Sequence, residues 1–421
     1  MRILILGVYY LPSSEASAKL IHELGKEFQR QNHEVTILAP SETITRDLEV
    51  SREDGLQVVR VKMGKIKGAA RPLRAWREVQ LSTTLWRKGK EFFKDHPCDL
   101  ILFYSPPIFF GPLISKLKSL WRCPAYLILR DIFPQWAVDV GVLKKGLIWS
   151  YFRWMELRQY AAADIIGVQS PANLKYFAEQ LPHKNYRLEV LYNWTTLESE
   201  HRGWLNYRQQ LGLEGKVVFF YGGNIGVAQG MDNLIRLAER LRHESQIYFL
   251  LVGAGTEVER LQAEIAAKNL PNIRILPAVG QKEYHAMLAE FDVGVISLNP
   301  RLKTQNYPGK ILGYMSAALP ILGSINPGND LSDMLEDNAA GLCSLNGDDQ
   351  TLYEQALKLA NDPVLRRRMG INARRLLERY FSVSVCAGQI LAHFQASPVF
   401  QYHSAAEAPL TAVSALENEL R

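Results

Sequence analysis

The sequence has few cysteines, and their spacing suits neither a disulfide framework nor a metal site. Its four cysteines lie far apart along 421 residues, and none belongs to a C-x-x-C pair. This usage fits a protein of a reducing compartment. The nine histidines form no H-E-x-x-H or H-x3-H pair, so we expect no bound metal and no metal cofactor.

Several other motifs are missing, and each absence removes a class of protein. No apolar run is long enough to span a membrane, and the opening run Met1–Leu6 is followed by no small-residue cleavage site. We therefore interpret it as the first β-strand of a cytoplasmic protein. No G-x-S-x-G elbow is present, which argues against a serine hydrolase. Neither a Walker motif nor a complete G-x-G-x-x-G fingerprint occurs, which argues against a P-loop NTPase and a nicotinamide oxidoreductase.

What the sequence does have is an uneven charge. The net charge is +6, yet the stretch from Arg60 to Lys94 holds eleven lysines and arginines against two glutamates. Such a patch predicts an anionic partner. Interleaved tryptophan and phenylalanine favour a membrane surface over nucleic acid, for which no binding motif accompanies the charge. The alternative is an amphipathic helix packed on its own sheet.

The predicted membrane patch is a set of basic and aromatic residues in this stretch. It comprises Lys62, Lys65, Lys67, Arg71, Arg74, Trp76, Arg77, Trp86, Arg87 and Lys88. A second contact is predicted further along the chain, with its own basic and aromatic residues. These are Lys144, Lys145, Trp149, Tyr151, Phe152, Arg153 and Trp154.

Short apolar runs alternate with helical stretches along the whole chain, and the pattern restarts after a polar bridge near 193–203. This alternation predicts an α/β protein with two doubly wound, parallel-sheet (Rossmann-like) domains that face a cleft. We expect an N-terminal domain over 1–195, a C-terminal domain over 196–380, and a helix over 381–394 that packs back on the first domain. Residues 395–421 are predicted to be a mobile tail.

Two loops of the second half are rich in glycine and follow predicted strands. Gly222-Gly223-Asn224-Ile225-Gly226, with Gln229 behind it, suits a cradle in which backbone amides hold a diphosphate. Gly253-Ala254-Gly255 is a weaker candidate of the same kind. The alternative for both loops is a tight strand-to-helix turn without a ligand.

A third loop places a lysine where a helix begins. Pro308-Gly309 predicts a turn, after which Lys310 opens a helix. A cation at a helix N-terminus opposes the usual charge preference, and a bound anion would resolve the conflict. The alternative is a solvated lysine. Three such loops in one half favour a nucleotide diphosphate as the ligand.

In the first half, Arg130-Asp131 follows an apolar strand and precedes Pro134. Ligands bind beyond the carboxyl ends of parallel strands, so this pair is expected to face the cleft. A carboxylate there could serve acid–base chemistry or hold a sugar hydroxyl. The alternative is an aspartate that caps a turn.

Taken as an ordered set, these motifs resemble those of glycosyltransferase family 4, the retaining GT-B enzymes. The resemblance runs from Arg2 to about Phe394 and is strongest to the branch that transfers N-acetyl-fucosamine-type sugars in bacterial O-antigen or capsule assembly. It also includes Gln31–Thr36 and the helix from Lys310 to Ala317.

The resemblance implies roles for individual residues. Asp131 and Lys310 would be the catalytic pair. The donor would be bound by Gly222, Gly223, Asn224, Gly226, Gln229, Gly253, Gly255, Gln305, Pro308 and Gly309. The acceptor would meet Ser13, Ser14, Glu15 and Arg130.

Several positions depart from the family pattern. The usual arginine and lysine of the second-domain loop are Asn224 and Gln229, and the usual pair of glutamates falls on Gln305 and Gly313. The histidine that often precedes the aspartate is Arg130.

These inferences lead to one predicted reaction. A UDP-sugar binds the second domain and gives its sugar, with retention, to a polyprenyl-diphosphate-linked saccharide at the inner leaflet of the cytoplasmic membrane. Lys310 and backbone amides stabilise the leaving group in place of a metal. Two other interpretations of the same fold are a nucleotide-sugar 2-epimerase and a non-catalytic binding protein.

Overall fold

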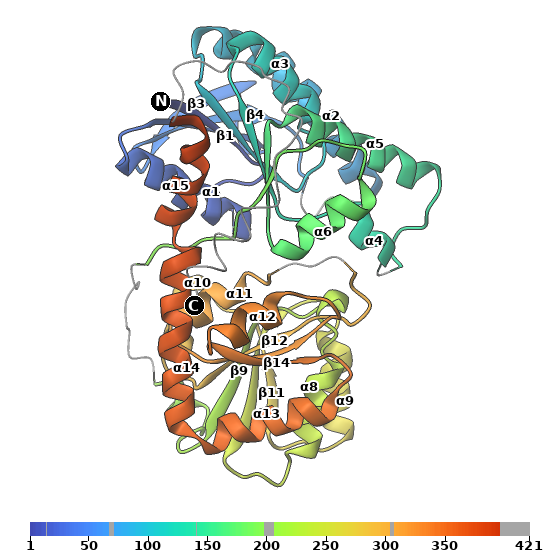
Figure 1. The fold of residues 1–421 in the computed structure, drawn as a ribbon, viewed down its shortest axis with the longest axis vertical. Helices are drawn as coiled ribbons and strands as arrows, with labels where there is room; N and C mark the ends of the chain where they lie inside the picture. Colours follow the sequence, from blue (N-terminus) through green and yellow to red (C-terminus); the bar gives the residue numbers. More distant parts are fainter. Residues whose placement is uncertain (14, 67–70, 140, 198–205, 304–306, 396–421) are drawn as a thin grey trace.

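The computed structural model describes residues 1–395 apart from 14, 67–70, 140, 198–205 and 304–306. The chain forms two α/β domains, one above the other in Figure 1. Each is built on its own sheet, which confirms the predicted fold class. No helix among the described residues is both long and apolar enough to cross a membrane.

The first sheet has the strand order β3-β4-β2-β1-β5-β6-β7-β8. Its strands are β1 (Arg2–Leu6), β2 (Glu34–Ser41), β3 (Leu48–Glu53), β4 (Leu56–Lys62), β5 (Leu100–Ser105), β6 (Ala125–Leu129), β7 (Ile165–Val168) and β8 (Leu188–Val190). All pairs are parallel except β3–β4, a hairpin closed by Asp54 and Gly55 with φ of 48° and 86°. The sequence did not predict β3, because this exposed edge strand lacks an apolar run.

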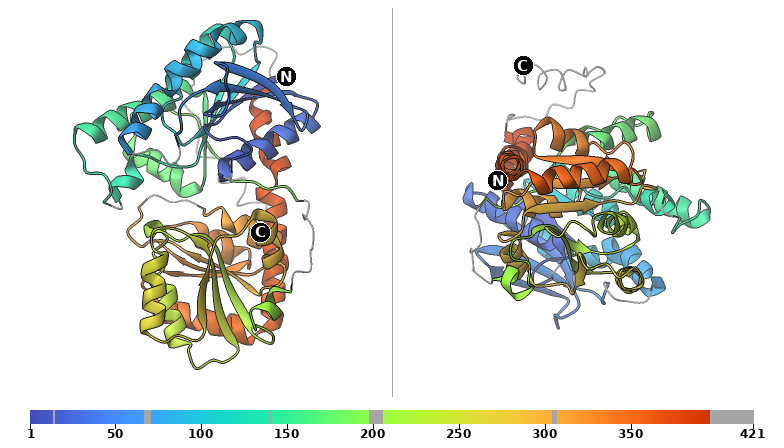
Figure 2. Two further views of the ribbon diagram at one scale, coloured as in Figure 1. Left: turned by 180° about the vertical axis from the view of Figure 1, so that it is seen from behind. Right: turned by 90° about the horizontal axis from the view of Figure 1, so that it is seen from below.

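Helices cover both faces of this sheet (Figure 2). They are α1 (Ala16–Arg30), α2 (Arg71–Asp95), α3 (Gly111–Trp121), α4 (Gln135–Asp139), α5 (Leu147–Ala162) and α6 (Pro171–Gln180). One hydrophobic core joins the sheet to α2, α3 and α5. The opposite core joins it to α1 and to the last helix, α15 (Val383–Gln395).

The second sheet is entirely parallel, with the order β11-β10-β9-β12-β13-β14. Its strands are β9 (Val217–Asn224), β10 (Ile247–Ala254), β11 (Ile273–Leu276), β12 (Val293–Ser297), β13 (Ile321–Ile325) and β14 (Gly341–Leu345). The edge strand β14 was not predicted. β9 and β10 also run further than expected, so that Gly222, Gly223 and Gly253 lie within strands rather than in turns.

The second domain has ten helical segments among its described residues, two of them not α-helical. They are α7 (Tyr207–Gln210), η1 (Val227–Gln229), α8 (Asp232–Arg240), α9 (Val258–Ala267), α10 (Gln281–Leu288), α11 (Lys310–Ser316), α12 (Leu331–Asp337), α13 (Asp349–Asn361), α14 (Pro363–Leu376) and the π-helical η2 (Leu377–Phe381).

The chain crosses between the domains twice, and the two crossings are tied together. Thr195 donates its backbone N–H to the carbonyl of Phe381 at 2.9 Å and accepts from Val383 at 3.0 Å. Beyond this bridge α15 packs against α1 in the first domain. The predicted mobile tail falls almost wholly on residues 396–421, which lie outside the described residues.

Candidate functional site

The two domains meet through loops at the carboxyl edges of their sheets. Gln169, which follows β7, donates its side-chain amide to the carbonyl of Tyr307 at 2.8 Å. The carboxylate of Asp330 accepts from the backbone N–H of Ala172, at the start of α6, at 2.6 Å. The rings of Tyr192 and Tyr307 stack with centroids 5.6 Å apart. The strand-end loops of the two domains therefore face each other, where parallel sheets bind ligands.

A cavity of about 590 Å³ opens between the domains at this boundary. Its wall combines one side chain of α4 with two loops of the second domain. The lining residues are Asp139, Pro300, Arg301, Leu302, Lys303 and Pro327. One side of the cavity is thus formed by the helix that follows Asp131, and the other side includes the loop that precedes Lys310.

Lys310, the first residue of α11, is turned toward the end of β9. Its Nζ donates to the hydroxyl of Tyr221 at 2.8 Å and lies 4.1 Å from the centroid of that ring. A Cβ on Gly223 would lie 3.4 Å from Lys310 Cε. Burial lowers the pKa of Lys310 to about 7. A cation held by a phenol instead of a carboxylate is well suited to receive an anionic ligand.

Three tyrosines form the floor beneath this loop. The hydroxyl of Tyr314 accepts from the N–H of Gly222 at 3.2 Å and donates to the carbonyl of Val295 at 3.0 Å. Tyr284 packs so closely that a Cβ on Gly222 would lie 2.3 Å from its ring. A Cβ on Gly313 would lie 3.1 Å from Leu288 Cδ1 and 3.2 Å from the Tyr284 ring. Leu288 and Tyr284 therefore crowd the position where the resemblance implies a glutamate.

Three backbone amides of the predicted diphosphate cradle are already bonded to other groups of the protein. Besides Gly222, Ile225 donates to the carbonyl of Ala254 at 2.9 Å, and Gly226 donates to Oε1 of Gln229 at 3.0 Å. The same oxygen accepts from the side chain of Asn224 at 2.8 Å. Gln229 therefore braces the loop, and Gly223 and Asn224 are its exposed residues.

Gly253 and Gly255 allow two backbones to approach closely. A Cβ on Gly253 would lie 1.9 Å from the carbonyl oxygen of Gly223, and one on Gly255 would lie 2.1 Å from that of Ile225. This close packing of the β10 end against the β9 end accounts for both glycines without a ligand. Their predicted contact with the donor stays a prediction.

The remaining donor-side candidates lie around Lys310. Pro308 is half-buried, and Gly309 is exposed and caps α11. Gln305 lies outside the described residues.

Asp131 lies at the carboxyl end of β6 and is half-buried. Burial raises the pKa of its carboxyl to about 6, and the positive charge of Arg130 opposes this rise. A carboxyl that titrates near neutral pH can both accept and give a proton. This chemistry suits the predicted role of Asp131.

Arg130 points elsewhere. Its guanidinium is buried and donates to the carbonyls of Leu191 at 2.7 Å and Tyr192 at 3.2 Å. It also lies 5.4 Å from the ring centroid of Trp194. The side chain therefore braces the strand end against the segment that leads to the second domain, and its predicted contact with an acceptor has no support in this geometry.

The predicted acceptor loop forms a turn ahead of α1. Ser13 donates its N–H to the carbonyl of Tyr10 at 3.0 Å, and the N–H of Glu15 donates to the hydroxyl of Ser13 at 3.3 Å. Two contacts fix the residues that precede this turn. Tyr10 bonds His22 at 2.8 Å, and Arg60 donates to the carbonyl of Leu11 at 2.7 Å. Ser14 lies outside the described residues.

The structure divides the predicted membrane patch. Trp86 packs on Phe93, 6.3 Å between centroids, so it belongs to the core side of α2. Lys88 pairs with Asp47 at 2.7 Å, and Arg74 pairs with Glu78 at 2.8 Å. Trp76, by contrast, is 58% exposed.

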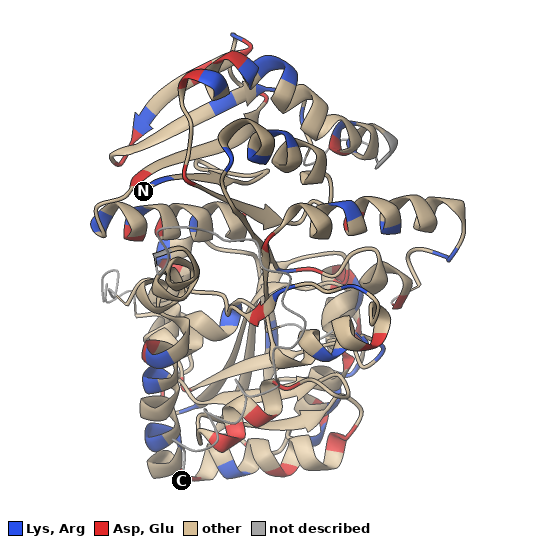
Figure 3. Ribbon diagram, turned by 45° about the horizontal axis from the view of Figure 1, so that its top comes forward, with Lys and Arg blue, Asp and Glu red and all other residues tan. Residues whose placement is uncertain are grey.

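The other patch residues differ in how much of them the structure describes. Lys62 bonds the carbonyl of Thr45 at 2.9 Å, Arg77 bonds that of Lys65, and Arg87 is exposed. Lys67 lies outside the described residues, as does the side chain of Arg71. Figure 3 shows that lysine and arginine are spread over both domains, with a row along α14.

The second predicted contact is only partly exposed. Trp154 is 51% and Tyr151 37% exposed, whereas Phe152 packs against the core and Arg153 pairs with the buried Glu156 at 2.6 Å. Lys144 and Lys145 are exposed.

Three apolar side chains that the sequence analysis did not name lie in the same segment. Leu147 is 91% exposed, Val142 73% and Ile148 65%. Exposed apolar side chains grouped in this way are typical of surfaces that meet a membrane or another apolar partner.

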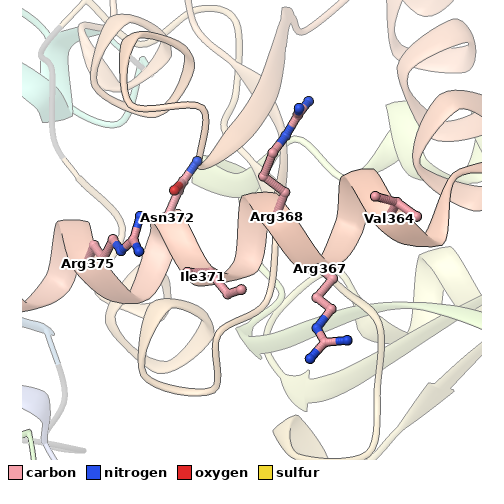
Figure 4. Close-up of a pocket in the computed structure, with 6 residues that line it drawn as sticks. All are labelled: Val364, Arg367, Arg368, Ile371, Asn372 and Arg375. Atoms are coloured by element: carbon pink, nitrogen blue, oxygen red, sulfur yellow. The ribbon is translucent and has the colours of Figure 1, made fainter.

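A second hollow, of about 310 Å³, lies along α14 and is formed by one face of that helix (Figure 4). It is lined by Val364, Arg367, Arg368, Ile371, Asn372 and Arg375. No second element of the described structure lines it, so it lacks the convergent groups of a catalytic site.

The sequence analysis missed the tyrosine floor and the residues that join the domains. Tyr221 and Tyr314 could have been noticed, since one ends a strand before the glycines and the other follows Lys310 by one helical turn. Asp330, Gln169 and Asp139 carried no local signal.

Comparison with known proteins assigns this chain to a family. Residues 17–199 match the model of "Glycosyltransferase Family 4", and residues 205–376 match that of "Glycosyl transferases group 1". The first match ends and the second begins between the two sheets. Together they cover both domains.

Individual relatives agree. The chain is 25% identical over 225 residues to the probable glycosyltransferase WbjE of Pseudomonas aeruginosa, covering 51% of this chain and about half (54%) of WbjE. It is 24% identical over 318 residues to WcaI of Escherichia coli, a putative colanic acid biosynthesis glycosyl transferase, covering 70% and 75%.

A solved structure shares the architecture. HepE of Anabaena, in complex with UDP and glucose, superposes with a TM-score of 0.68 at 15% identity and covers 94% of this chain and 100% of its own. Among the described residues, no group of three or more histidine, cysteine or acidic side chains could hold a metal. The chain belongs to the group 1 and family 4 glycosyltransferases, enzymes with the GT-B fold.

Proposed function

We propose that the enzyme transfers a sugar, with retention, from a UDP-sugar to a polyprenyl-diphosphate-linked saccharide in the synthesis of a bacterial surface polysaccharide. The family matches and the description of WcaI support the polysaccharide context. An N-acetyl-fucosamine-type sugar is the donor residue that we favour, on the resemblance of the sequence to that branch.

The observation that carries the donor assignment is Lys310. It is a cation at the end of β9 whose described hydrogen-bond partner is the neutral hydroxyl of Tyr221, 2.8 Å away. A diphosphate would supply the missing negative charge and would return the pKa of the lysine toward its ordinary value. The bound UDP of HepE supports a uridine nucleotide.

The reaction follows from these groups. As the bond between the anomeric carbon and the diphosphate breaks, negative charge grows on the leaving oxygen. Lys310 and the exposed edge of the Gly223–Asn224 loop stabilise this charge, with no metal assigned a part. In a front-face displacement the acceptor hydroxyl attacks from the side of the departing phosphate, which takes up its proton. We assign to Asp131, at the carboxyl end of β6 in the first domain, the binding of acceptor or sugar hydroxyls.

The acceptor explains the exposed apolar surface. We propose that Leu147, Ile148 and Trp154 rest on the inner leaflet of the cytoplasmic membrane, with Lys144 and Lys145 at its anionic head groups. The enzyme would then be cytoplasmic and peripheral to the membrane. A charged residue in place of Leu147 would weaken this association.

The direct test is transfer. Purified enzyme is incubated with a panel of UDP-sugars and short-chain isoprenyl-diphosphate saccharides, and the products are identified by mass. We expect one donor to give a product one sugar heavier, without added metal. Conversion of the donor without acceptor would replace the proposal with an epimerase, and donor binding without any product would replace it with a binding protein.

A further inference from the structure

The cavity between the domains joins groups of three chemical kinds at one place. Arg301 and Lys303 supply positive charge, Asp139 supplies a carboxylate, and the exposed apolar segment begins three residues beyond Asp139. The backbone makes the last connection direct, since Leu143 donates its N–H to the carbonyl of Ala137 at 2.9 Å. The chain therefore folds back on α4 and brings Val142, 73% exposed, close to the cavity wall.

Asp139 gives the cavity a carboxylate oxygen that the described residues leave without a hydrogen bond. Its Oδ1 accepts from the side chain of Gln135 at 2.7 Å, while its Oδ2 is buried and has no hydrogen-bond partner among the described residues. A buried carboxylate oxygen in this state is costly and is satisfied by a donor from a ligand. Sugar hydroxyls are such donors, whereas a phosphate is not.

The cations on the other wall of the cavity could bind the anionic part of the same ligand. Arg301 and Lys303 are exposed on the loop between β12 and Tyr307, on the opposite wall from α4. Arginine and lysine side chains bind phosphate oxygens, arginine through two parallel hydrogen bonds. The wall thus carries two positive charges against one negative, which favours an anion that also presents hydroxyl groups.

The apolar segment gives the third part. From Val142 to Trp154 the chain exposes large apolar side chains, and in Figure 1 the segment between α4 and α5 projects from the first domain. A ligand that presents sugar hydroxyls, phosphates and a hydrocarbon chain would meet all three surfaces. Such a molecule is a glycosyl diphosphate lipid.

We propose that this cavity is the binding site for the acceptor head group. Arg301 and Lys303 hold the lipid diphosphate, Asp139 bonds a hydroxyl of the attached sugar, and the hydrocarbon chain leaves along Val142, Leu147 and Ile148. The inference rests on the proposed function for its acceptor class. It adds that the acceptor is held by both domains, with its phosphates on the second one.

Binding is measured first, with UDP at saturation to occupy the donor site. The probes are farnesyl diphosphate in phosphatidylcholine vesicles, farnesol in the same vesicles, and vesicles of phosphatidylglycerol alone. We expect Arg301→Ala to weaken binding to the farnesyl diphosphate vesicles tenfold or more and to change the other two less than twofold. The pair Leu147→Ser and Ile148→Ser should weaken all three.

The matched control is Arg367→Ala, which removes an exposed arginine from the hollow on α14 (Figure 4) and should leave every probe unchanged. Equal loss of phosphatidylglycerol binding in Arg301→Ala would overturn the proposal, because the arginine would then serve the bulk lipid surface. A loss of UDP affinity as large as the loss for farnesyl diphosphate would also overturn it, because the cations would then belong to the donor.

Asp139→Ala separates the sugar from the diphosphate. It should weaken the N-acetylglucosaminyl conjugate of farnesyl diphosphate and leave farnesyl diphosphate itself unchanged. Equal effects on both probes would contradict the sugar contact. If the enzyme transfers sugar to lipid acceptors while Arg301→Ala keeps a normal KM for them, this inference fails and the proposed function stands. If no lipid acceptor is used at all, the proposed function itself fails.

Discussion

A buried or half-buried cation lies at the carboxyl edge of the sheet in each domain, and the two cations have very different partners. Arg130 of the first domain is bonded to the carbonyls of Leu191 and Tyr192. Lys310 of the second domain donates to the hydroxyl of Tyr221. Burial lowers the pKa of both groups. The difference teaches that a charged residue at a strand end indicates function only when its partners inside the protein leave its charge unmet.

The largest expected effect comes from Lys310. Lys310→Ala should lower kcat/KM by about 10²–10³-fold, the range seen when a group that stabilises transition-state charge is removed. Circular dichroism and thermal unfolding should stay close to those of the parent enzyme, because a half-buried, poorly compensated charge is lost. Lys282→Ala, on an exposed position of α10, is the control. A near-normal rate would remove Lys310 from the mechanism.

Arg130 should show the opposite pattern. Arg130→Ala leaves the carbonyls of Leu191 and Tyr192 without their donor, at a cost of about 2–3 kcal/mol in the free energy of unfolding. For a domain of about 150–250 residues, the size class of the first domain, that corresponds to a fall in Tm of roughly 4–12 °C. The KM for the donor, measured well below the new Tm, should change little. An intact Tm together with a raised KM for the acceptor would make Arg130 the acceptor residue that the sequence suggested.

The pH dependence of donor binding tests the same difference between Lys310 and Arg130. The pKa of Lys310 in the empty enzyme is about 7, and a diphosphate binds its protonated form. Donor affinity should therefore fall as pH rises above about 7, by up to about tenfold per pH unit, because the protonated fraction of the lysine falls by that factor. Lys310→Arg, whose side chain stays charged, should flatten this profile. A flat profile in the parent enzyme would contradict the assignment.

The lowered pKa of Lys310 also makes the free energy of unfolding depend on pH. Because the folded pKa lies below the ordinary value of 10.5, the folded enzyme binds fewer protons than the unfolded chain between these pH values. The contribution of Lys310 to the free energy of unfolding therefore rises with pH from about 7 to 10.5. Lys310→Met should abolish that part of the rise, which is measured by urea unfolding of the empty enzyme.

The smallest expected effect is that of Tyr221→Phe. It removes one hydroxyl that accepts from Lys310 and donates to the carbonyl of Asn224 at 2.6 Å. A hydrogen bond to a charged group is worth about 1.5 kcal/mol or more, so we expect the KM for the donor to rise by about tenfold, with a smaller change in kcat. Tyr353→Phe, on α13 in the same domain, serves as the control. An unchanged KM would mean that the packing of α11 alone positions the lysine.

The strand pattern allowed the fold to be predicted because parallel strands buried on both faces are continuous apolar runs. It failed at β3 and β14, the edge strands, where exposure removes that signal. Of the site candidates, the structure brings Lys310 next to Gly223, two residues that local motifs indicated separately. Their binding of a donor stays a prediction.

The other contacts of the site and the surface could not be predicted from local sequence. The partners of Arg130 lie about sixty residues further along the chain, and Lys88 meets Asp47 from a hairpin that the pattern did not show. The glycine loop had the composition of a phosphate cradle, yet Gln229 and Ala254 take up its amides. Which polar groups pair is decided by tertiary packing, and composition does not record it.

The position of α15 in the sequence has a consequence for folding during synthesis. Val383, Cys386, Ile390 and Leu391 of α15 belong to the same core as β1 and α1, although the whole second domain separates them along the chain. One face of the first sheet therefore stays partly uncovered until α15 has been synthesised. The buried core residues of the second domain lie within 207–381, so this domain can fold before α15 completes the first domain.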